Sequence, residues 1–178
     1  NIMASIYVAC LASYNNGWLH GKWIDASIGY EEVLEEINKM LKESPVTKEY
    51  GEIAEEWAIH DSQGFGNYHV EEWGNLEEIC EIANLLESHP EGELILEVLN
   101  HLGSGTSVDD AVNFFEDNYG GTYDNLGDFA YEYSNNVSEI PRSLEYYIDW
   151  EAMGRDMEIN GEIFSIDHDR KLHVFWNL

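Results

Sequence analysis

Lysine and arginine are absent from residues 49–141, a run of 93 residues. The same run contains 16 Glu and 6 Asp, so it carries −22 of the chain's formal charge of −28. The residues before it contribute −2 and the residues after it −4. A small domain stays soluble with a net charge of magnitude roughly 2 to 8, and self-repulsion at a higher charge opposes the compact state. The charge therefore predicts a surface directed at a strongly basic partner.

Cysteine is also scarce, since the chain has only Cys10 and Cys80. Neither belongs to a CxxC or Cys/His spacing of the kind that binds zinc. We expect both to be small buried hydrophobic residues in a reducing cytoplasm. No signal peptide and no apolar run of about 18 residues occurs, so we expect neither secretion nor a membrane span.

Aromatic and aliphatic residues are abundant, which sets this chain apart from disordered acidic proteins. Hydrophobic residues make up 44% of the sequence and aromatic residues 13%, including six Trp and eleven Tyr. A disordered acidic segment would have few of either. We therefore expect a folded chain, with room in 178 residues for one large domain or two to three small ones.

The first part of the sequence has the pattern of a hairpin, a helix and a further strand. Apolar alternation and the turn residues 14–17 predict paired strands over 5–12 and 18–26. Apolar residues at i, i+4, i+7 and i+8 predict a helix over 31–42 that ends before Pro45. A third strand is expected over 56–61.

The acidic middle has helical periodicity. Asn75 is a candidate N-cap for a helix over 76–88, and Gly103 a candidate stop for a helix over 91–102. Ser107 resembles the cap of a helix over 108–117. A loop at 118–121 then leads to a helix over 125–134.

After Pro141 we expect a helix over 142–153 that stops at Gly154, followed by strands at 156–159, 162–166 and 171–176. The whole pattern predicts an α+β fold with antiparallel sheets at both ends and a helical, acidic middle. We expect an elongated chain of three small modules: an N-terminal α/β module over 3–61, a helical acidic module over 62–118, and a C-terminal α/β module over 119–178 that mediates dimerisation.

The carboxylates are spaced in a way that an ordinary solvated helix avoids. Lysine is the usual companion four residues after Glu, yet here the companion is another acid in Glu77/Glu81, Glu93/Glu97 and Asp124/Asp128/Glu132. Each such pair costs a few tenths of a kcal/mol. A solvated acidic face explains any one Glu but not 93 residues without a base. Adaptation to high salt would spread the acids evenly, which the charges of −2, −22 and −4 contradict.

Charge spacing indicates the kind of partner. An i, i+4 stripe places one charge per ~6 Å of helix axis, whereas B-DNA carries one per ~1.7 Å. One stripe is too sparse to imitate a duplex, but several helices side by side reach that density. An elongated dimer would distribute the charge along a line.

The sequence resembles the ArdA family of antirestriction proteins, which mobile genetic elements carry. The resemblance rests on IYVACLASYNNGWLHGKWID at 6–25, EEWAIHD at 55–61 and SLEYYIDWEAMGRDMEINGEIFSI at 143–166. It implies an elongated homodimer of three small α/β modules per chain, paired through the C-terminal module. It also implies a mimic of bent B-form DNA that occupies the DNA groove of type I restriction-modification enzymes, principally their methyltransferase core.

From charge and resemblance together we expect a cytoplasmic protein that is not an enzyme and needs no cofactor or metal. Its partner would be a type I restriction-modification enzyme. We expect it to bind neither nucleic acid nor a membrane. The carboxylates predicted to form the DNA-mimic surface are Glu71, Glu72, Glu77, Glu78, Glu81, Glu87, Glu93, Glu97, Asp109, Asp110, Glu116, Asp117, Asp124, Asp128 and Glu132. The candidate dimer interface is Tyr146, Tyr147, Trp150 and Arg155, since aromatic residues are enriched at interfaces. Core packing is the alternative for the C-terminal aromatic residues, including Phe164, Phe175 and Trp176.

Three other interpretations remain open. Paired carboxylates serve glycoside hydrolases, and His60–Asp61 resembles an acid–base pair, but GxSxG, HExxH and P-loop motifs are missing. Oxygen-bearing residues over 117–128 lack the register of an EF-hand loop. The chain is alternatively an acidic inhibitor or chaperone of another basic DNA-binding protein, which charge alone does not distinguish from restriction inhibition.

Overall fold

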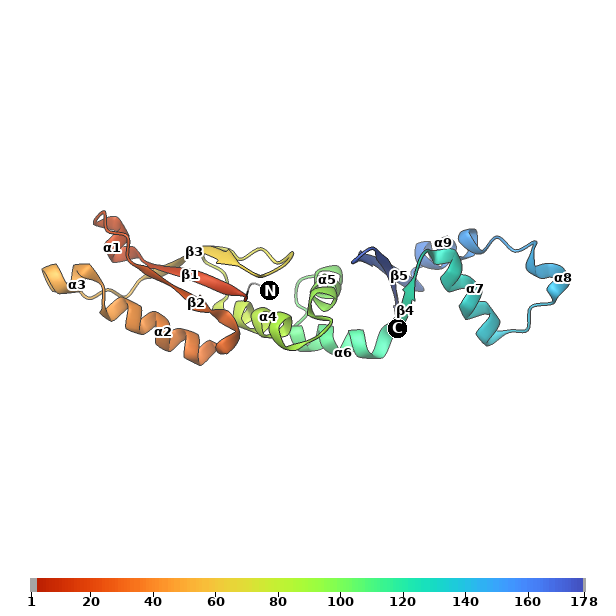
Figure 1. The fold of residues 1–178 in the computed structure, drawn as a ribbon, viewed down its shortest axis with the longest axis horizontal. Helices are drawn as coiled ribbons and strands as arrows, with labels where there is room; N and C mark the ends of the chain where they lie inside the picture. Colours follow the sequence, from red (N-terminus) through yellow and green to blue (C-terminus); the bar gives the residue numbers. More distant parts are fainter. Residues whose placement is uncertain (1–2, 178) are drawn as a thin grey trace. The chain divides into compact units, whose positions relative to one another are not determined.

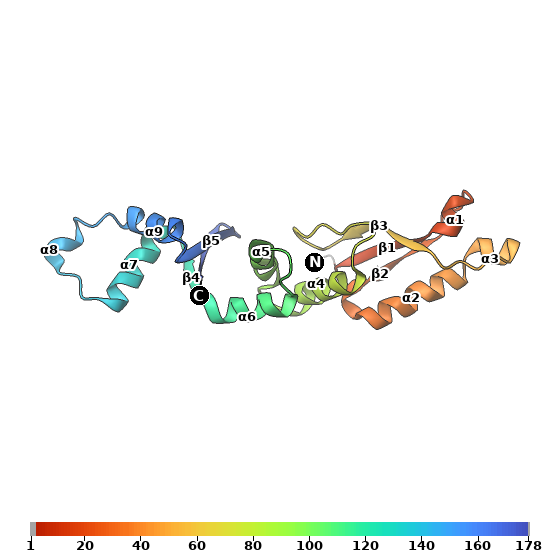
Figure 2. The same cartoon turned by 180° about the vertical axis from the view of Figure 1, so that it is seen from behind.

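Two units make up the chain, Asn1–Leu96 (the N-terminal unit) and Glu97–Leu178 (the C-terminal unit). The computed structural model describes residues 3–177 of them, and Figures 1 and 2 show their helices and strands from two sides. Each unit contains one three-stranded antiparallel sheet, and helices occupy the middle of the sequence. The predicted α+β class is therefore confirmed. The division into three modules stays a prediction.

The sheet of the N-terminal unit has the strand order β2-β1-β3. Its strands are β1 (Ser5–Cys10), β2 (Gly21–Asp25) and β3 (Trp57–Gln63). Ile6 lies opposite Ile24 in the β1–β2 pair, which confirms the predicted hairpin. A short helix, α1 (Leu11–Asn15), occupies the connection where a turn was expected. The central strand β1 buries Ile6 and Val8 completely, so the hydrophobic alternation of the sequence fixes which face meets the helices.

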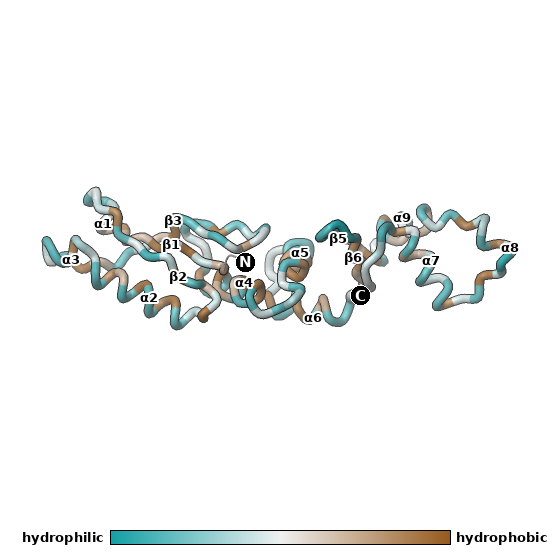
Figure 3. The backbone as a smooth tube through the Cα atoms, viewed as in Figure 1, coloured by the Kyte–Doolittle hydropathy of each residue, from teal (hydrophilic) through white to brown (hydrophobic). Residues whose placement is uncertain are grey.

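Helices cover this sheet and extend its core. The helix α2 (Tyr30–Lys42) packs against β1 and β2, and α4 (Leu76–Ser88) packs against α2 and the 3-10 turn η1 (Ala26–Ile28). In Figure 3, hydrophobic positions recur along α2 between hydrophilic ones. Val33 and Ile37 are buried at such positions, as the 3.6-residue period of a helix requires. The short helix α3 (Pro45–Tyr50) follows, with Pro45 at its start.

The C-terminal unit has the strand order β4-β6-β5. The helix α5 (Gly92–Leu102) contains the boundary between the units. The remaining elements are α6 (Val108–Asn118), β4 (Tyr119–Tyr123), α7 (Leu126–Val137), α8 (Arg142–Glu145), α9 (Trp150–Ile159), β5 (Ile163–His168) and β6 (Lys171–Trp176). Phe129, Met157, Ile163 and Val174 form the core between α7, α9 and the sheet.

The two N-caps predicted from the sequence lie at the starts of two acidic helices, α4 and α6. The side chain of Asn75 accepts a hydrogen bond from the Glu78 N–H at 3.2 Å at the start of α4. The Ser107 hydroxyl accepts one from the Asp110 N–H at 3.0 Å at the start of α6. Each satisfies one of the N–H groups that a helix start leaves without an intrahelical partner. Both caps are therefore confirmed.

The loop predicted at 118–121 is wrong, because Tyr119–Tyr123 is the strand β4. Tyr119 lies opposite Phe175 on β6, and the register shifts between Tyr119 and Gly121. A Cβ on Gly120 would lie 3.1 Å from the Val174 carbonyl oxygen. The two glycines therefore mark a bulge in a paired strand, where the backbone approaches its neighbour closely, and not a free loop.

The helix predicted over 142–153 and the strand predicted over 156–159 are both wrong. Two separate helices, α8 and α9, occupy this part of the chain, and α9 runs through Gly154 to Ile159. The side chain of Asp149 accepts a hydrogen bond from the Ala152 N–H at 3.0 Å and so starts α9. Met153 and Met157, four residues apart, both pack into the core, which is helical spacing that the alternation over 156–159 concealed.

The aromatic residues of the C-terminal unit differ in burial. Phe164 and Phe175 are buried and stack with ring centroids 5.1 Å apart, and Trp176 packs against the core. Tyr146 and Tyr147 are 92% and 86% exposed. Core packing is therefore the role of the phenylalanines and Trp176 but not of these two tyrosines.

Both cysteines are buried and free, as expected. The Cys10 thiol donates to the Ser44 hydroxyl at 3.5 Å, and Ser44 also shares a 2.6 Å hydrogen bond with Ser13. In the part of the chain that the structure describes, no helix combines the length and apolar character that crossing a membrane requires.

Gly154 supplies the first test of this fold. A Cβ at Gly154 would lie 2.5 Å from the Leu126 carbonyl oxygen, so α7 and α9 approach each other through this glycine. We expect Gly154→Ala to lower the free energy of unfolding by about 1–3 kcal/mol through overpacking, although alanine favours an isolated helix. Urea unfolding measures the change.

The matched control is Gly127→Ala on α7, where the atoms nearest the added Cβ belong to side chains, the carboxylate of Glu151 at 2.7 Å and Asn125 Oδ1 at 3.1 Å. A smaller loss is expected there. Equal losses for the two variants would show that backbone approach at Gly154 is not the constraint.

Candidate partner-binding surface

Carboxylates cover the solvent face of α4 and the turn before it. Glu77, Glu78, Glu81 and Glu87 are exposed on α4, while most of the apolar residues between them are buried. Glu71 and Glu72 are exposed in the preceding turn, and Glu93 is exposed in the first turn of α5. We call the seven residues Glu71, Glu72, Glu77, Glu78, Glu81, Glu87 and Glu93 the N-terminal acidic surface.

The C-terminal unit carries a second set on α6, on α7 and in the bend between β4 and α7. Of the eight predicted acids in this unit, only Glu97 is half-buried and the others are exposed. We call the seven exposed residues the C-terminal acidic surface: Asp109, Asp110, Glu116, Asp117, Asp124, Asp128 and Glu132. Fourteen of the fifteen predicted acids are therefore exposed, and the amphipathic pattern of the helices accounts for the eleven of these that lie on helices.

The positions of these acids along the helices show which of them stabilise the helix through its dipole and which do not. Anionic side chains are favourable near a helix N-terminus and unfavourable near the C-terminus, by about 0.3–1 kcal/mol each. The helix α2 follows this rule, with Glu31 and Glu32 in its first turn and Lys39 and Lys42 in its last. The helices α4, α6 and α7 also have acids in the first turn, but none has a basic residue in the last turn.

Carboxylates instead extend to the C-terminal ends of two of these helices. Glu87 lies one residue before the end of α4, and Glu116 and Asp117 lie in the last turn of α6. The Glu87 carboxylate accepts a hydrogen bond from the Ala4 N–H at 3.2 Å, which gives it a structural partner. Glu116 and Asp117 are exposed, and the helix dipole does not account for them.

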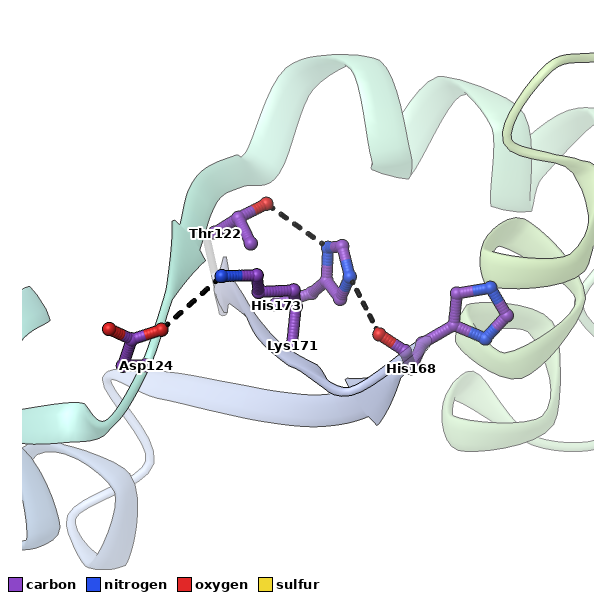
Figure 4. Close-up of polar contacts among 5 residues, drawn as sticks. All are labelled: Thr122, Asp124, His168, Lys171 and His173. Atoms are coloured by element: carbon purple, nitrogen blue, oxygen red, sulfur yellow. Dashed lines mark hydrogen bonds and ion pairs between the residues drawn. The ribbon is translucent and has the colours of Figure 1, made fainter.

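Asp124 and Glu97 each contact a basic or imidazole group from a distant part of the chain. Lys171 Nζ lies 3.3 Å from Asp124 Oδ1, and a dashed line in Figure 4 marks this ion pair. Glu97 Oε1 lies 3.9 Å from His168 Nδ1. Asp124 also precedes the first residue of α7, so the expected spacing of Asp124, Asp128 and Glu132 on one helix holds only for the last two.

The histidine at the centre of Figure 4, His173, connects the strands of the C-terminal sheet. His173 is buried, with Nδ1 2.8 Å from the Tyr119 hydroxyl and 3.4 Å from the Thr122 hydroxyl. Its Nε2 lies 3.3 Å from the His168 carbonyl oxygen. These contacts join β4, β6 and the end of β5, so His173 positions the strand that leads to Asp124.

The negative charge of the acids adds to the raised pKa values of nearby side chains. Burial raises the pKa of Tyr68 to about 12, and the charges of Glu78 and Glu71 add to the increase. Burial likewise raises the pKa of Cys80 to about 11, with a contribution from Glu81. In the C-terminal unit, burial and then Glu132 raise the pKa of Tyr123. Each shift favours the neutral form, as expected beside fixed negative charge.

One cleft contains residues that the sequence did not single out. It lies in the N-terminal unit and is lined by Leu11, Glu55, Glu56, Trp57, Glu72, Trp73 and Gly74. Of these only Glu72 belongs to the predicted surface. Trp73 is 69% exposed, whereas hydrophobicity alone would predict a buried tryptophan.

The remaining candidates from the sequence are an acid–base pair at His60 and a metal site. His60 lies in β3 and packs its ring against Tyr14 in an edge-on contact of 5.4 Å, with Glu72 Oε1 3.7 Å from its Nε2. Among residues 3–177, no group of three or more His, Cys, Asp and Glu side chains is arranged to hold a metal ion.

A protein-family model described as Antirestriction protein (ArdA) matches residues 6–171 of the 178. The chain belongs to the ArdA family of antirestriction proteins. The resemblance seen in the sequence is thereby confirmed, and the match includes all fifteen predicted acids. ArdA membership makes antirestriction the function of the chain and indicates restriction-modification enzymes as its partners. No curated protein matches the sequence.

The field around Tyr68 can be tested by titration. We expect Glu78→Gln to lower the pKa of Tyr68 from about 12 toward the usual 10.0, because one of the charges that disfavour the phenolate is removed. Phenolate absorbance of the protein, minus that of the Tyr68→Phe variant, isolates this one tyrosine. Glu77→Gln removes the same charge at an exposed neighbour and should shift the pKa less. An unchanged Tyr68 titration in Glu78→Gln would contradict the proposed field.

The same pKa shift has a consequence for stability. Because the folded-state pKa of Tyr68 is raised, its contribution to stability is fully present below pH 10.0 and is lost as the pH rises through about 12. In wild type the free energy of unfolding should fall over this range more than in Tyr68→Phe.

Proposed function

We propose that this ArdA protein is a mimic of B-form DNA that competes with DNA for the binding groove of type I restriction-modification enzymes. The observation that carries the proposal is the extension of exposed carboxylates to the C-terminal end of α6, where Glu116 and Asp117 oppose the helix dipole. Local stability does not account for acids at these positions. A partner that requires negative charge there does.

The mechanism follows from the chemistry of phosphate recognition. A groove that binds DNA presents Lys and Arg to phosphates, and release of condensed counterions supplies much of its affinity. Carboxylates on the two acidic surfaces would accept the same cations. They are attached to helices that are already folded, so no deformation energy of several kcal/mol is required as for bent DNA. The protein would act by occupancy, without catalysing a reaction.

We also propose that the active form is a homodimer assembled through the C-terminal unit. Tyr146 and Tyr147 are almost fully exposed, and Leu144 is exposed beside them. Trp150 is half-buried and packs edge-on against Tyr131 at 5.3 Å, and Arg155 is exposed on α9. Exposed aromatic residues of this kind are typical of interface cores. A dimer would double the charge presented to the enzyme.

The position of the acids, as distinct from their number, can be tested with two variants of equal charge. The first replaces Glu77, Glu78, Glu81, Asp109, Asp110, Glu116 and Asp117 by the corresponding amides. We expect its inhibition of a type I methyltransferase to weaken at least about ten-fold, because each lost ion pair contributes roughly 0.2–1 kcal/mol. The dependence of the inhibition constant on salt should also become shallower.

The control replaces seven exposed acids outside the proposed surfaces: Glu31, Glu35, Glu43, Asp156, Glu162, Asp167 and Asp169. Both variants carry −21, seven charges fewer than −28. Equal weakening of the two would mean that total charge and not a DNA-like array determines inhibition. Full inhibition by the first variant, or binding to basic nucleoid proteins in preference to the enzyme, would contradict the proposal.

Sedimentation velocity tests the dimer. We expect wild type to sediment as a dimer and the double variant Tyr146→Ser/Tyr147→Ser to dissociate at the same concentration, because two large apolar contacts are lost. The matched control is Tyr14→Ser/Tyr50→Ser, which removes two exposed tyrosines of the N-terminal unit. Monomeric wild type, or dissociation of both double variants alike, would rule out this interface.

A further inference from the structure

The cleft around Trp73 has aromatic walls and a carboxylate rim. Trp57 and Trp73 line it together with Glu55, Glu56 and Glu72. Among the residues that the structure describes, no lysine or arginine lines it. All its residues belong to the N-terminal unit, so the cleft is complete within one folded unit.

Backbone hydrogen bonds hold the parts of this cleft in place. The Ile59 N–H donates to the Glu72 carbonyl oxygen at 3.2 Å, which ties the turn that carries Trp73 to the edge strand β3. The Leu11 N–H donates to the Glu56 carbonyl oxygen at 3.0 Å, which ties the residue before Trp57 to the end of β1. The two tryptophans therefore stand on backbone that is anchored to the sheet.

Imitation of phosphate does not require these tryptophans. A phosphate-like surface needs only exposed carboxylates, and an indole at 69% exposure adds apolar area to water. Aromatic rings beside carboxylates are instead the combination that binds an organic cation, through the ring face and the charge together.

We propose that this cleft receives an arginine side chain of the basic protein partner. A guanidinium group is planar, stacks on an indole face, and donates two parallel hydrogen bonds to a carboxylate. A lysine ammonium is a compact, strongly hydrated point charge that lacks the flat face. Trp73 and Trp57 supply the stacking surfaces, and Glu55, Glu56 and Glu72 supply the counter-charge.

The identity of the partner as a restriction-modification enzyme rests on the proposed function, but the preference of the cleft for arginine over lysine does not. Charge complementarity excludes an acidic occupant, because three carboxylates line the cleft and no cation offsets them. Glu72 also lies beside His60, with its Oε1 3.7 Å from the His60 Nε2.

Indole N–H resonances of the full-length protein test the cleft directly. The probes are blocked Gly-Arg-Gly and Gly-Lys-Gly peptides of equal charge, and Trp73→Phe assigns the Trp73 signal. We expect the arginine peptide to shift the Trp73 resonance saturably, with a dissociation constant about two- to five-fold lower than that of the lysine peptide. Trp23, which is exposed on β2 and does not line the cleft, is the internal control. Equal shifts with both peptides, or equal shifts of Trp73 and Trp23, would overturn the proposal.

Inhibition of the enzyme separates this site from charge mimicry. Trp73→Ala keeps the net charge at −28, so we expect the inhibition constant to rise about two- to five-fold with an unchanged salt dependence. Trp23→Ala is the matched control and should inhibit as wild type does. If Trp73→Ala inhibits fully, the arginine site is wrong while mimicry stands. If Trp73→Ala is weakened and the seven-amide variant is not, mimicry is wrong while the arginine site stands.

Discussion

Burial of an apolar face is what allows each acidic helix to keep a charged one. On α4, Glu77 and Glu81 stand four residues apart and repel each other at a cost of a few tenths of a kcal/mol. The same helix buries Ile79 and Ile82 completely, and each buried side chain of this size contributes about 1.5–3 kcal/mol. Burial exceeds repulsion several-fold, so the tertiary contacts and not the helix itself maintain the array. Helix formation by isolated acidic segments would not give the same surface.

Comparison of α2 with α6 shows that the acids are not a uniform property of the chain. The helix α2 has acids in its first turn and lysines in its last, and Glu36 within it pairs with Lys22 and Lys39. These contacts lower the pKa of Glu36. The helix α6 has acids at both ends and no base. One chain therefore contains a helix whose charges at both ends favour its dipole and another whose last-turn acids oppose it, and this difference supports the proposed surface better than the total charge does.

Local signals in the sequence predicted α2, α4, α5, α6 and α7 but missed α1 and α3 and misplaced α9. Contacts between distant residues determined the rest of what it missed. Asn75 and Ser107 mark helix starts because capping acts within three residues. The sequence did not predict the strand β4, because Tyr119 pairs with Phe175, which lies far along the chain, and because the glycines of β4 resemble those of a loop. In the acidic surfaces, helical periodicity placed most carboxylates in solvent. It gave no warning that Lys171 would pair with Asp124 across 47 residues, or that Trp73 would stand exposed in a cleft.

Charge and shape contribute differently to a mimic of nucleic acid. A dense anionic surface attracts any basic groove, raises association rates, and loses strength as salt rises. It discriminates poorly between partners, because every such groove presents lysine and arginine. Discrimination requires contacts that depend on the position of one group, and fixed aromatic surfaces beside carboxylates provide this. The acidic surfaces and the tryptophan cleft would then divide the work, the first governing how fast a partner is met and the second how long a matching one is held.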